Sequence, residues 1–327
     1  MEAAADWGGV ASLVLLLMVV LTDALVGALP GLGAAFDAPL NAIRWVAGWF
    51  DGKLNRVRRG GETRRLRGLI VVVIVLALAW LVGAGLNWAA RSMPEGWIVE
   101  AVTLFTLLRY RVCISCMLTA RRLLDSGKAA DAREAVDTLV RYDVRALDNF
   151  GLARAAIEGG AARFSDRFIA TIFWYLLLGL PGAFVCRSLN AAADIIGTYS
   201  PRHESFGFVA SRLDYILNLG PSFIVGPVIG IAAIFVPRAS AFGALGGWFN
   251  DLKERGAGQD YRGEGAVAGA LGVALGGPRT FGDRTVAGAW VGDGRARATS
   301  QDIQRAIFLL SIAALLVAVA LALAIGR

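Results

Sequence analysis

A glycine-spaced stretch in the C-terminal third of the chain is the first pattern that could do chemistry. It reads AGALGVALGGP at residues 268–278, and VGDG follows at residues 291–294. Glycine-rich loops can present backbone amides to phosphate oxygens. A Walker-type loop also needs Gly-Lys followed by Ser or Thr, and a dinucleotide fingerprint needs a preceding strand with GxGxxG spacing. The stretch shows neither pattern, so phosphate binding is the weaker interpretation.

The spacing of the glycines favours helix packing instead. Gly265, Gly269, Gly272 and Gly276 recur at intervals of four, three and four residues, which places them on one face of a helix. Small residues on such a face let a second helix approach closely. We therefore expect a close helix contact here, with the GGP end as the helix stop.

The cysteines and the single histidine indicate little chemistry. Cys113 and Cys116 form a CxxC within RYRVCISCMLTARR, with only Cys186 and His203 as possible further ligands. A structural metal site needs four ligands at suitable spacing. The two cysteines are expected to be small core residues on an apolar helix, and His203, alone in a polar loop, a surface residue.

Four charged residues leave a structural and a functional interpretation open. Arg154 and Glu158 lie four residues apart on a helix face, either as a simple ion pair or as parts of a site. Asp214 either belongs to a site or pairs with Arg212. Asp23 lies near the end of an apolar stretch, where an ionisable group is costly, so it is functional or reaches the interface.

The elements that must position these residues are membrane helices. The 327 residues are 56% hydrophobic, with a mean hydropathy of +0.58, which is too apolar for an ordinary soluble domain. Five stretches are long or apolar enough to enter a bilayer, and a sixth is shorter. The five are Val10 to Leu29, Gly68 to Ala90, Trp97 to Leu118, Phe168 to Cys186 and Ala306 to Ile325, and the sixth is Pro221 to Pro237.

Basic residues predict the orientation of these spans. The segment from Pro30 to Arg67 holds eight basic residues against three acids, and 121–167 is rich in arginine, so both are expected in the cytoplasm. The N-terminus is then outside, and the first stretch is a retained anchor because MEAAADW carries no basic residue. The net charge of +7 reflects this asymmetry and not nucleic-acid binding. The side of residues 187–220 stays open, because Pro181 predicts a broken helix.

The expected fold class is therefore all-α, a polytopic integral membrane protein of five or six transmembrane helices. It forms one membrane domain over residues 1–327. Two segments lie outside the bilayer: a helical cytoplasmic segment at 121–167 and a Gly-rich segment at 238–305.

Several motifs together resemble a known family. AGALGVALGGP, followed by AWVGDG and DIQRA, closely resembles the C-terminal region of the CobD/CbiB cobalamin-biosynthesis membrane proteins. The segment ARAAIEGGAARFSDRFIATIFWYLLLGLPGAF resembles the family's central part, and RSLNAAADIIG with FGFVASRLDYILNLGP resembles the part after it. LTDALVGALP and APLNAIRWVAGWFDGKLNR fall where the family has its first span and its LNR stretch. The resemblance covers nearly the whole chain, in family order.

Departures from the family pattern concentrate at polar positions. Ala162 and Arg163 stand where the family usually has Glu-Asn, Tyr215 replaces the second Asp of Arg-Leu-Asp-Asp, Ala193 ends a run usually read as Asn-Thr-Leu-Asp, and Ala38 replaces a histidine. Glycine and apolar positions persist. This pattern is expected where a fold is retained and chemistry has drifted.

The resemblance implies an enzyme of cobalamin biosynthesis in the bacterial inner membrane. It implies ATP-driven amide formation between adenosylcobyric acid, a corrinoid carboxylate, and aminopropanol or its phosphate, which gives adenosylcobinamide or its phosphate. ATP and Mg²⁺ are the implied cofactors. The alternative is a non-catalytic regulatory membrane protein of the AmpE-like type on the same fold.

Such chemistry needs carboxylates, cations for phosphate, and groups that orient amine and acid. The implied catalytic residues are Glu158, Asp166 and Asp214, of which Glu158 and Asp166 would also bind the metal. The implied substrate-binding residues are Arg154, Asn190, Arg212, Asn218 and Asp293.

Overall fold

The computed structural model describes most of the chain. The described residues are 10–27, 33–56, 58, 60–197, 202–254, 263–281 and 284–326. Arg59, one of the basic residues counted above, lies outside them. Helices dominate, as expected from the sequence, and the strands are only two or three residues long.

The elements follow in chain order. The helices are α1 (Val10–Val26), α2 (Gly33–Leu54), α3 (Gly61–Ser92), α4 (Gly96–Leu108), α5 (Tyr110–Asp125), α6 (Ala129–Asp137), α7 (Asn149–Arg163), a π-helical segment η1 (Phe164–Ile169), α8 (Ala170–Ile196), α9 (Phe208–Ile234), α10 (Ala241–Glu254), α11 (Glu264–Leu271) and α12 (Ser300–Ile325). The strands are β1 (Leu275–Gly276), β2 (Arg279–Phe281), β3 (Arg284–Val286) and β4 (Trp290–Val291), paired β1 with β4 and β2 with β3.

Five helical segments of the described chain are long and apolar enough to span a membrane. They are Gly61–Ser92, Gly96–Asp125, Asn149–Ile196, Phe208–Ile234 and Ser300–Ile325. The chain is therefore a multi-pass membrane protein. Phe208–Ile234 extends the sixth, shorter stretch of the sequence prediction into a full-length candidate. The first predicted span is a shorter helix, since α1 has 17 residues where about 20 are needed to cross the hydrocarbon core.

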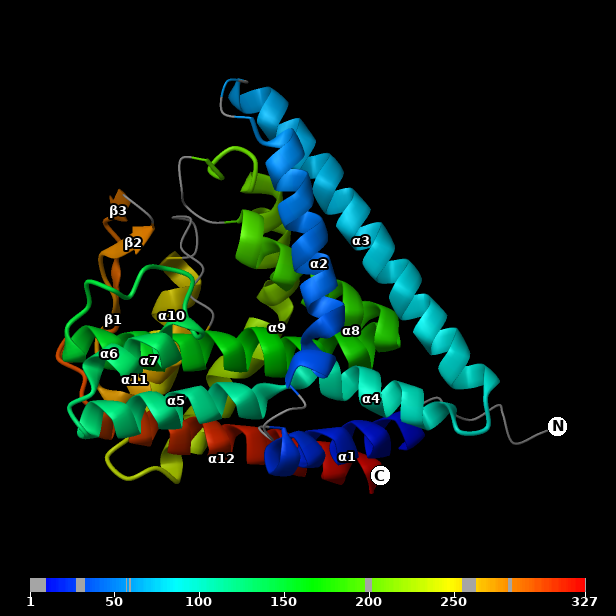
Figure 1. Cartoon of the computed structure of the whole chain (residues 1–327). Helices are drawn as coiled ribbons and strands as arrows, with labels where there is room; N and C mark the ends of the chain where they lie inside the picture. The colour runs from blue at the N-terminus through cyan, green and yellow to red at the C-terminus, as the bar shows by residue number, and fades with distance from the viewer. Residues whose placement is uncertain are drawn as a thin grey trace. The chain divides into compact units, whose positions relative to one another are not determined.

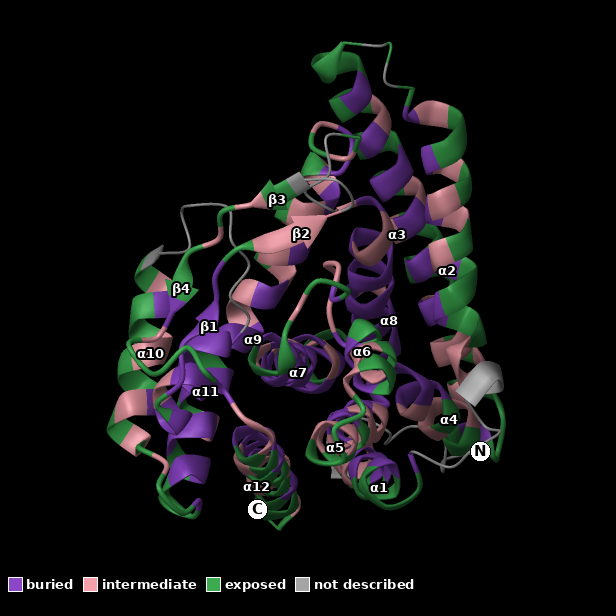
Figure 2. Ribbon diagram, turned by 60° about the vertical axis from the view of Figure 1, so that its left-hand side comes forward, coloured by how far each residue is buried: buried purple, intermediate pink, exposed green. Residues whose placement is uncertain are grey.

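The chain divides into two compact units. The first comprises Met1–Arg109, Ala170–Leu219 and Ala320–Arg327, and the second comprises Tyr110–Ile169 and Gly220–Val319. Figure 1 traces the helices of both units, and Figure 2 shows that α7 and α8 are buried on most of their surfaces.

In the first unit, α2 and α3 form a helical hairpin, and both pack against α8. Gly83 of α3 allows the close approach to α8, since a Cβ there would lie 2.8 Å from Cα of Pro181. Gly68 of α3 lies against the segment before α9, where a Cβ would lie 1.9 Å from the carbonyl oxygen of Phe206. The helix break predicted from Pro181 is confirmed at Gly179, whose φ of 67° and ψ of −156° interrupt α8. Only glycine adopts this conformation readily.

In the second unit, α10 and α11 pack through glycines on both helices. A Cβ on Gly265 would lie 2.5 Å from the oxygen of Gly247, and one on Gly269 would lie 1.9 Å from the oxygen of Gly243. The close helix contact expected from the glycine spacing is therefore confirmed for these two residues.

The same expectation is wrong for the other two glycines of the repeat. Gly272 is the left-handed C-cap of α11 with φ of 66°, and open space surrounds it. Gly276 lies in β1 with φ of 76° and faces Ala289. The helix thus stops at Gly272 and not at the GGP end, because a left-handed glycine ends a helix wherever it occurs.

Candidate active site

A π-helical turn interrupts the helix that carries most of the central motif. It spans Phe164–Ile169, and it holds Ser165 and Asp166 almost fully buried. Single π turns inside α-helices are rare and recur at functional sites. A Cβ on Gly263, the residue before α11, would lie 4.0 Å from Cβ of Ser165, so the start of α11 lies beside this turn.

Glu158 lies two turns before the π-helical turn on α7, and three groups hold its carboxylate. The backbone amide of Gly276 donates to Oε1 at 2.6 Å. The hydroxyl of Tyr142 donates to Oε2 at 2.7 Å, and Nη2 of Arg279 donates to the same oxygen at 3.1 Å. The glycine turn at the end of AGALGVALGGP therefore binds an anion of its own chain, the Glu158 carboxylate.

Arg279 joins this carboxylate to a second one. Its Nη2 lies 3.2 Å from Oε2 of Glu264, in the first turn of α11. Both glutamates are almost fully buried, at 3% and 5% exposure. One guanidinium thus bridges two buried carboxylates from α7 and α11, and we name Tyr142, Glu158, Glu264 and Arg279 the glutamate cluster.

The electrostatics of the cluster keep Tyr142 neutral and Arg279 charged. Burial raises the pKa of Tyr142 well above its usual value, and the Glu158 carboxylate raises it further. Burial by itself would lower the pKa of Arg279, but the carboxylates of Glu264 and Glu158 outweigh it and raise that pKa.

A second polar network lies in the first unit, within α8 and α9. Asp214 is fully buried, and its Oδ1 accepts hydrogen bonds from the amides of Asn190 and Asn218. Nη1 of Arg187 donates to Asn190 at 3.2 Å, and its Nε donates to the carbonyl oxygen of Leu107 at 3.0 Å. Both helices are candidate spans, and polar chains inside spans are costly and by default functional. We name Arg187, Asn190, Asp214 and Asn218 the asparagine network.

The residues expected to form the site therefore fall into two groups. Glu158 and Asp166 belong to the second unit, and Asn190, Asp214 and Asn218 belong to the first and contact one another. Arg212 is exposed on α9, whereas Asp214 is buried. Arg154 does not pair with Glu158; it donates to the carbonyl oxygen of Ala296 at 2.7 Å. Asp293 is exposed in the turn after β4.

The glycines around Asp293 have a packing role. Gly292 has φ of 85°, and a Cβ on Gly294 would lie 2.2 Å from the backbone of Gly272 at the end of α11. The GDG turn therefore packs on the C-cap of α11, and larger residues would separate the two.

Four functional candidates were missed from the sequence: Tyr142, Arg187, Glu264 and Arg279. Arg187 carries the only available signal, a charge three residues before Asn190 in an apolar run. Tyr142 and Arg279 reach Glu158 from 16 and 121 residues away, a separation that no local spacing encodes.

The structure supports the core position of Cys113 but not the surface position of His203. Cys113 is buried and Cys116 half-buried, both as free thiols, which confirms the core assignment for Cys113. His203 is not a surface residue: its side chain is 14% exposed, and its Nε2 lies 3.1 Å from Oδ1 of Asp51. Asp51 lies near the C-terminal end of α2, far from His203 in sequence.

The carboxylate, imidazole and thiol side chains of the described residues do not form a preformed metal site. Among the described residues, no group of three or more His, Cys, Asp or Glu side chains is arranged to hold a metal ion. Glu158 already accepts hydrogen bonds on both oxygens. Metal binding by Glu158 and Asp166 stays a prediction.

Comparison with known proteins identifies the family of this chain. The family model described as CobD/Cbib protein matches residues 16–310. The chain belongs to the CobD/CbiB family. A protein from Sinorhizobium fredii named cobalamin biosynthesis protein CobD is 34% identical over 299 residues, which cover 89% of this chain and 90% of that protein. A protein of the same name from another Sinorhizobium is 32% identical over 90% of this chain and 92% of its own length.

A relative from another bacterial genus is less similar in sequence but also matches over most of its length. The protein of that name from Citrobacter koseri is 29% identical over 84% of this chain and 87% of its own length. No solved structure gives a significant match. The glutamate cluster and the asparagine network both lie within residues 16–310, which the family model matches.

Proposed function

We propose that this protein is an adenosylcobinamide-phosphate synthase of cobalamin biosynthesis. It joins the carboxylate of adenosylcobyric acid to the amine of aminopropanol or its phosphate in an amide bond, with ATP as the source of free energy. The observation that carries the proposal is the extent of the family match, which runs from residue 16 to residue 310 and includes every residue of both polar groups. The names of the relatives point to the same pathway.

The buried polar groups suit this chemistry. An amine attacks an activated carboxylate only when neutral, and a carboxylate within hydrogen-bonding distance can accept its proton. Glu158 and Glu264 are buried carboxylates, and Arg279 beside them carries a fixed charge. Asp166 in the π-helical turn and Asp214 in the asparagine network are the other acidic candidates.

ATP and Mg²⁺ belong to the proposal through the family resemblance. Mg²⁺ in nucleotide-dependent enzymes is commonly held by one or two carboxylates together with the phosphates, not by a protein cage. Asp166 and Glu158, whose oxygens accept three hydrogen bonds, are the proposed ligands. Arg154, Arg212 and Asp293 are proposed to contact substrate.

The proposed location is the bacterial inner membrane. The regulatory alternative is not favoured, because the relatives that match over most of their length carry the cobalamin-biosynthesis name.

The test is a product assay with purified protein in lipid vesicles. The protein is incubated with adenosylcobyric acid, Mg-ATP and either aminopropanol or its phosphate, and products are separated and weighed by mass spectrometry. We expect a corrinoid heavier by the arm minus one water, only when ATP is present. The Sinorhizobium fredii relative, prepared in the same way, is the positive control. A product from the relative and none from this chain with either arm would overturn the proposal.

A further inference from the structure

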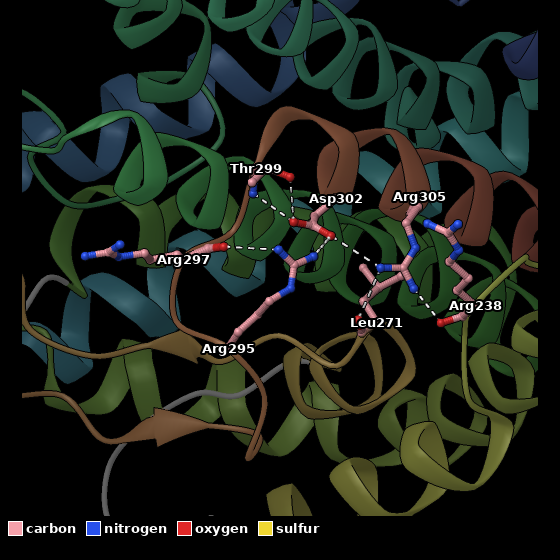
Figure 3. Close-up of polar contacts among 7 residues, drawn as sticks. All are labelled: Arg238, Leu271, Arg295, Arg297, Thr299, Asp302 and Arg305. Carbon is pink, nitrogen blue, oxygen red and sulfur yellow. Dashed lines mark hydrogen bonds and ion pairs between the residues drawn. The ribbon is translucent and has the colours of Figure 1, made fainter.

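Four arginines of the second unit gather at the ends of two candidate spans. Arg238 follows α9, Arg295 and Arg297 precede α12, and Arg305 lies in its second turn. Figure 3 shows them around Asp302, and we name these four arginines and Asp302 the basic cluster.

Asp302 is the buried centre of the cluster. It is 1% exposed, and its Oδ2 accepts from the amide and the hydroxyl of Thr299 at 2.8 and 2.9 Å. Its Oδ1 lies 2.5 Å from Nη2 of Arg295 and 3.3 Å from Nη1 of Arg305. Arg305 also donates to the carbonyl oxygen of Arg238 at 2.5 Å, which ties the end of α9 to the start of α12.

The cluster carries more positive than negative charge. It holds four guanidinium groups and one carboxylate, which pairs with Arg295 and Arg305, and among the described residues no other carboxylate lies within ion-pair distance of the four. Arg238 and Arg297 are exposed, and half of the Arg295 side chain is exposed. The surplus cations therefore reach the surface.

The position of the cluster along the spans is that of lipid headgroups. No charged residue occurs between Asp214 and Arg238, or between Arg305 and Arg327, so each apolar run begins or ends at the cluster. An aromatic ring lies beside it: Arg297 is 5.6 Å from the ring centre of Phe150. Arg154, which donates to the carbonyl oxygen of Ala296 next to Arg297, is 5.2 Å from the ring centre of Trp290. Phe150 and Trp290 are partly exposed. Arginines and Trp at span ends are typical of a membrane interface.

We infer that the basic cluster is a docking surface for anionic phospholipids, whose phosphodiester headgroups its exposed guanidinium groups bind. The arrangement favours lipid over a free phosphate. Figure 3 shows the side chains of Arg297 and Arg238 at opposite ends of the cluster, so their donors spread along the surface instead of converging on one small anion. Several headgroups side by side fit this spread, and charge attraction to anionic lipid adds to membrane binding.

The test uses a variant that leaves the hydrogen bonds of Asp302 intact. Arg238→Gln with Arg297→Gln removes two exposed charges, whereas Arg295 and Arg305 still hold the carboxylate. Full-length protein, stripped of lipid in neutral detergent, is titrated with phosphatidylglycerol or phosphatidylcholine, and bound lipid is counted by native mass spectrometry. Each removed cation is expected to weaken phosphatidylglycerol binding roughly fivefold, and the pair roughly 25-fold. Phosphatidylcholine binding should not change.

Two controls keep the outcome decisive. Arg145→Gln removes an exposed arginine outside the basic cluster and should bind phosphatidylglycerol as the natural chain does. If the double variant does not fold, Arg238→Lys with Arg297→Lys keeps the charge and should keep most of the binding, while the single change Arg297→Gln should weaken it. Unchanged phosphatidylglycerol binding in the folded glutamine variants would overturn the inference. So would complete displacement of the lipid by millimolar inorganic phosphate, which would mark a free-phosphate site.

Discussion

Nη2 of Arg279 lies 3.1 Å from Oε2 of Glu158, across 121 residues of chain. The same nitrogen reaches Glu264, so one cation balances two buried carboxylates that come from α7 and α11. This bridge joins the central motif of the chain to its glycine-rich region.

Removal of this cation should destabilise the second unit. Arg279→Met leaves two buried carboxylates without their bridge, and loss of one partner of a buried ion pair costs about 3–5 kcal/mol. The apparent Tm in detergent, followed by the fluorescence of a thiol dye or of tryptophan, should fall clearly, and Arg279→Lys should recover part of the loss. Arg145→Met, at an exposed ion pair, is the control. A melting curve of Arg279→Met that matches this control would show that the bridge does not stabilise the fold.

The hydroxyl of Tyr142 should contribute stability that disappears in alkali. Its pKa is raised in the folded protein, so the contribution is complete below the unfolded pKa of about 10 and declines as pH rises above it. The measurement is the difference in Tm between the natural chain and Tyr142→Phe at pH 7, 9 and 10.5. We expect a constant difference up to pH 9 and a smaller one at pH 10.5. A difference that grows with pH would contradict the assignment.

The two glycines Gly269 and Gly272 should respond differently to substitution. Gly269→Leu should prevent assembly of α10 on α11, since even a Cβ would overlap the oxygen of Gly243. Gly272→Ala should cost only about 1 kcal/mol, because the strain comes from a left-handed residue and not from crowding. Gly246→Ala on α10, where nothing lies within 4 Å, is the neutral control. Yield of folded protein by size-exclusion chromatography ranks the three; equal yields of Gly269→Leu and Gly246→Ala would refute the packing argument.

Asp214→Asn and Asp166→Asn should each abolish most of the proposed activity while the protein stays in the membrane. Loss of one group from a preorganised polar site commonly costs about 100-fold or more in rate. The vesicle assay gives the rate, and an immunoblot of the membrane fraction gives the amount. Asp131→Asn, at an exposed position of α6, should keep full activity. Vigorous turnover by both site variants would mean that the chemistry lies on other residues.

The loop after α8 should face the same side of the membrane as the loop between α2 and α3. Nη2 of Arg202 lies 3.0 Å from Oδ2 of Asp51, and the Asn55 amide donates to the carbonyl oxygen of Arg202 at 2.8 Å. Lys53→Cys and Glu204→Cys, each on a background with the natural cysteines replaced, should react with an impermeant thiol reagent from the same side only. With the basic loop in the cytoplasm, as predicted, that side is cytoplasmic. Labelling from opposite sides would separate the two loops and refute the contact.

Composition and spacing determined the broad features of this protein, because they depend on local properties of the chain. Hydropathy predicted membrane helices, Pro181 predicted the break in α8, and the spacing of Gly265 and Gly269 predicted their close helix contact. Motif order indicated the family. Each of these signals lies within one helix or one short segment, where periodicity and backbone preference act directly.

Only the tertiary structure decided which polar side chains meet. Glu158 and Arg154 share a helix face, yet they do not pair. Glu158 accepts hydrogen bonds from Tyr142 and Arg279, whereas Arg154 donates to Ala296. A charged side chain is stabilised by the partner that the fold brings near it. Gly272 and Gly276 continue the helical spacing, yet the left-handed conformation at Gly272 ends α11 before Gly276 is reached. Contacts such as Arg279 with Glu158 join positions far apart in the chain, and no periodic pattern in a single sequence records them.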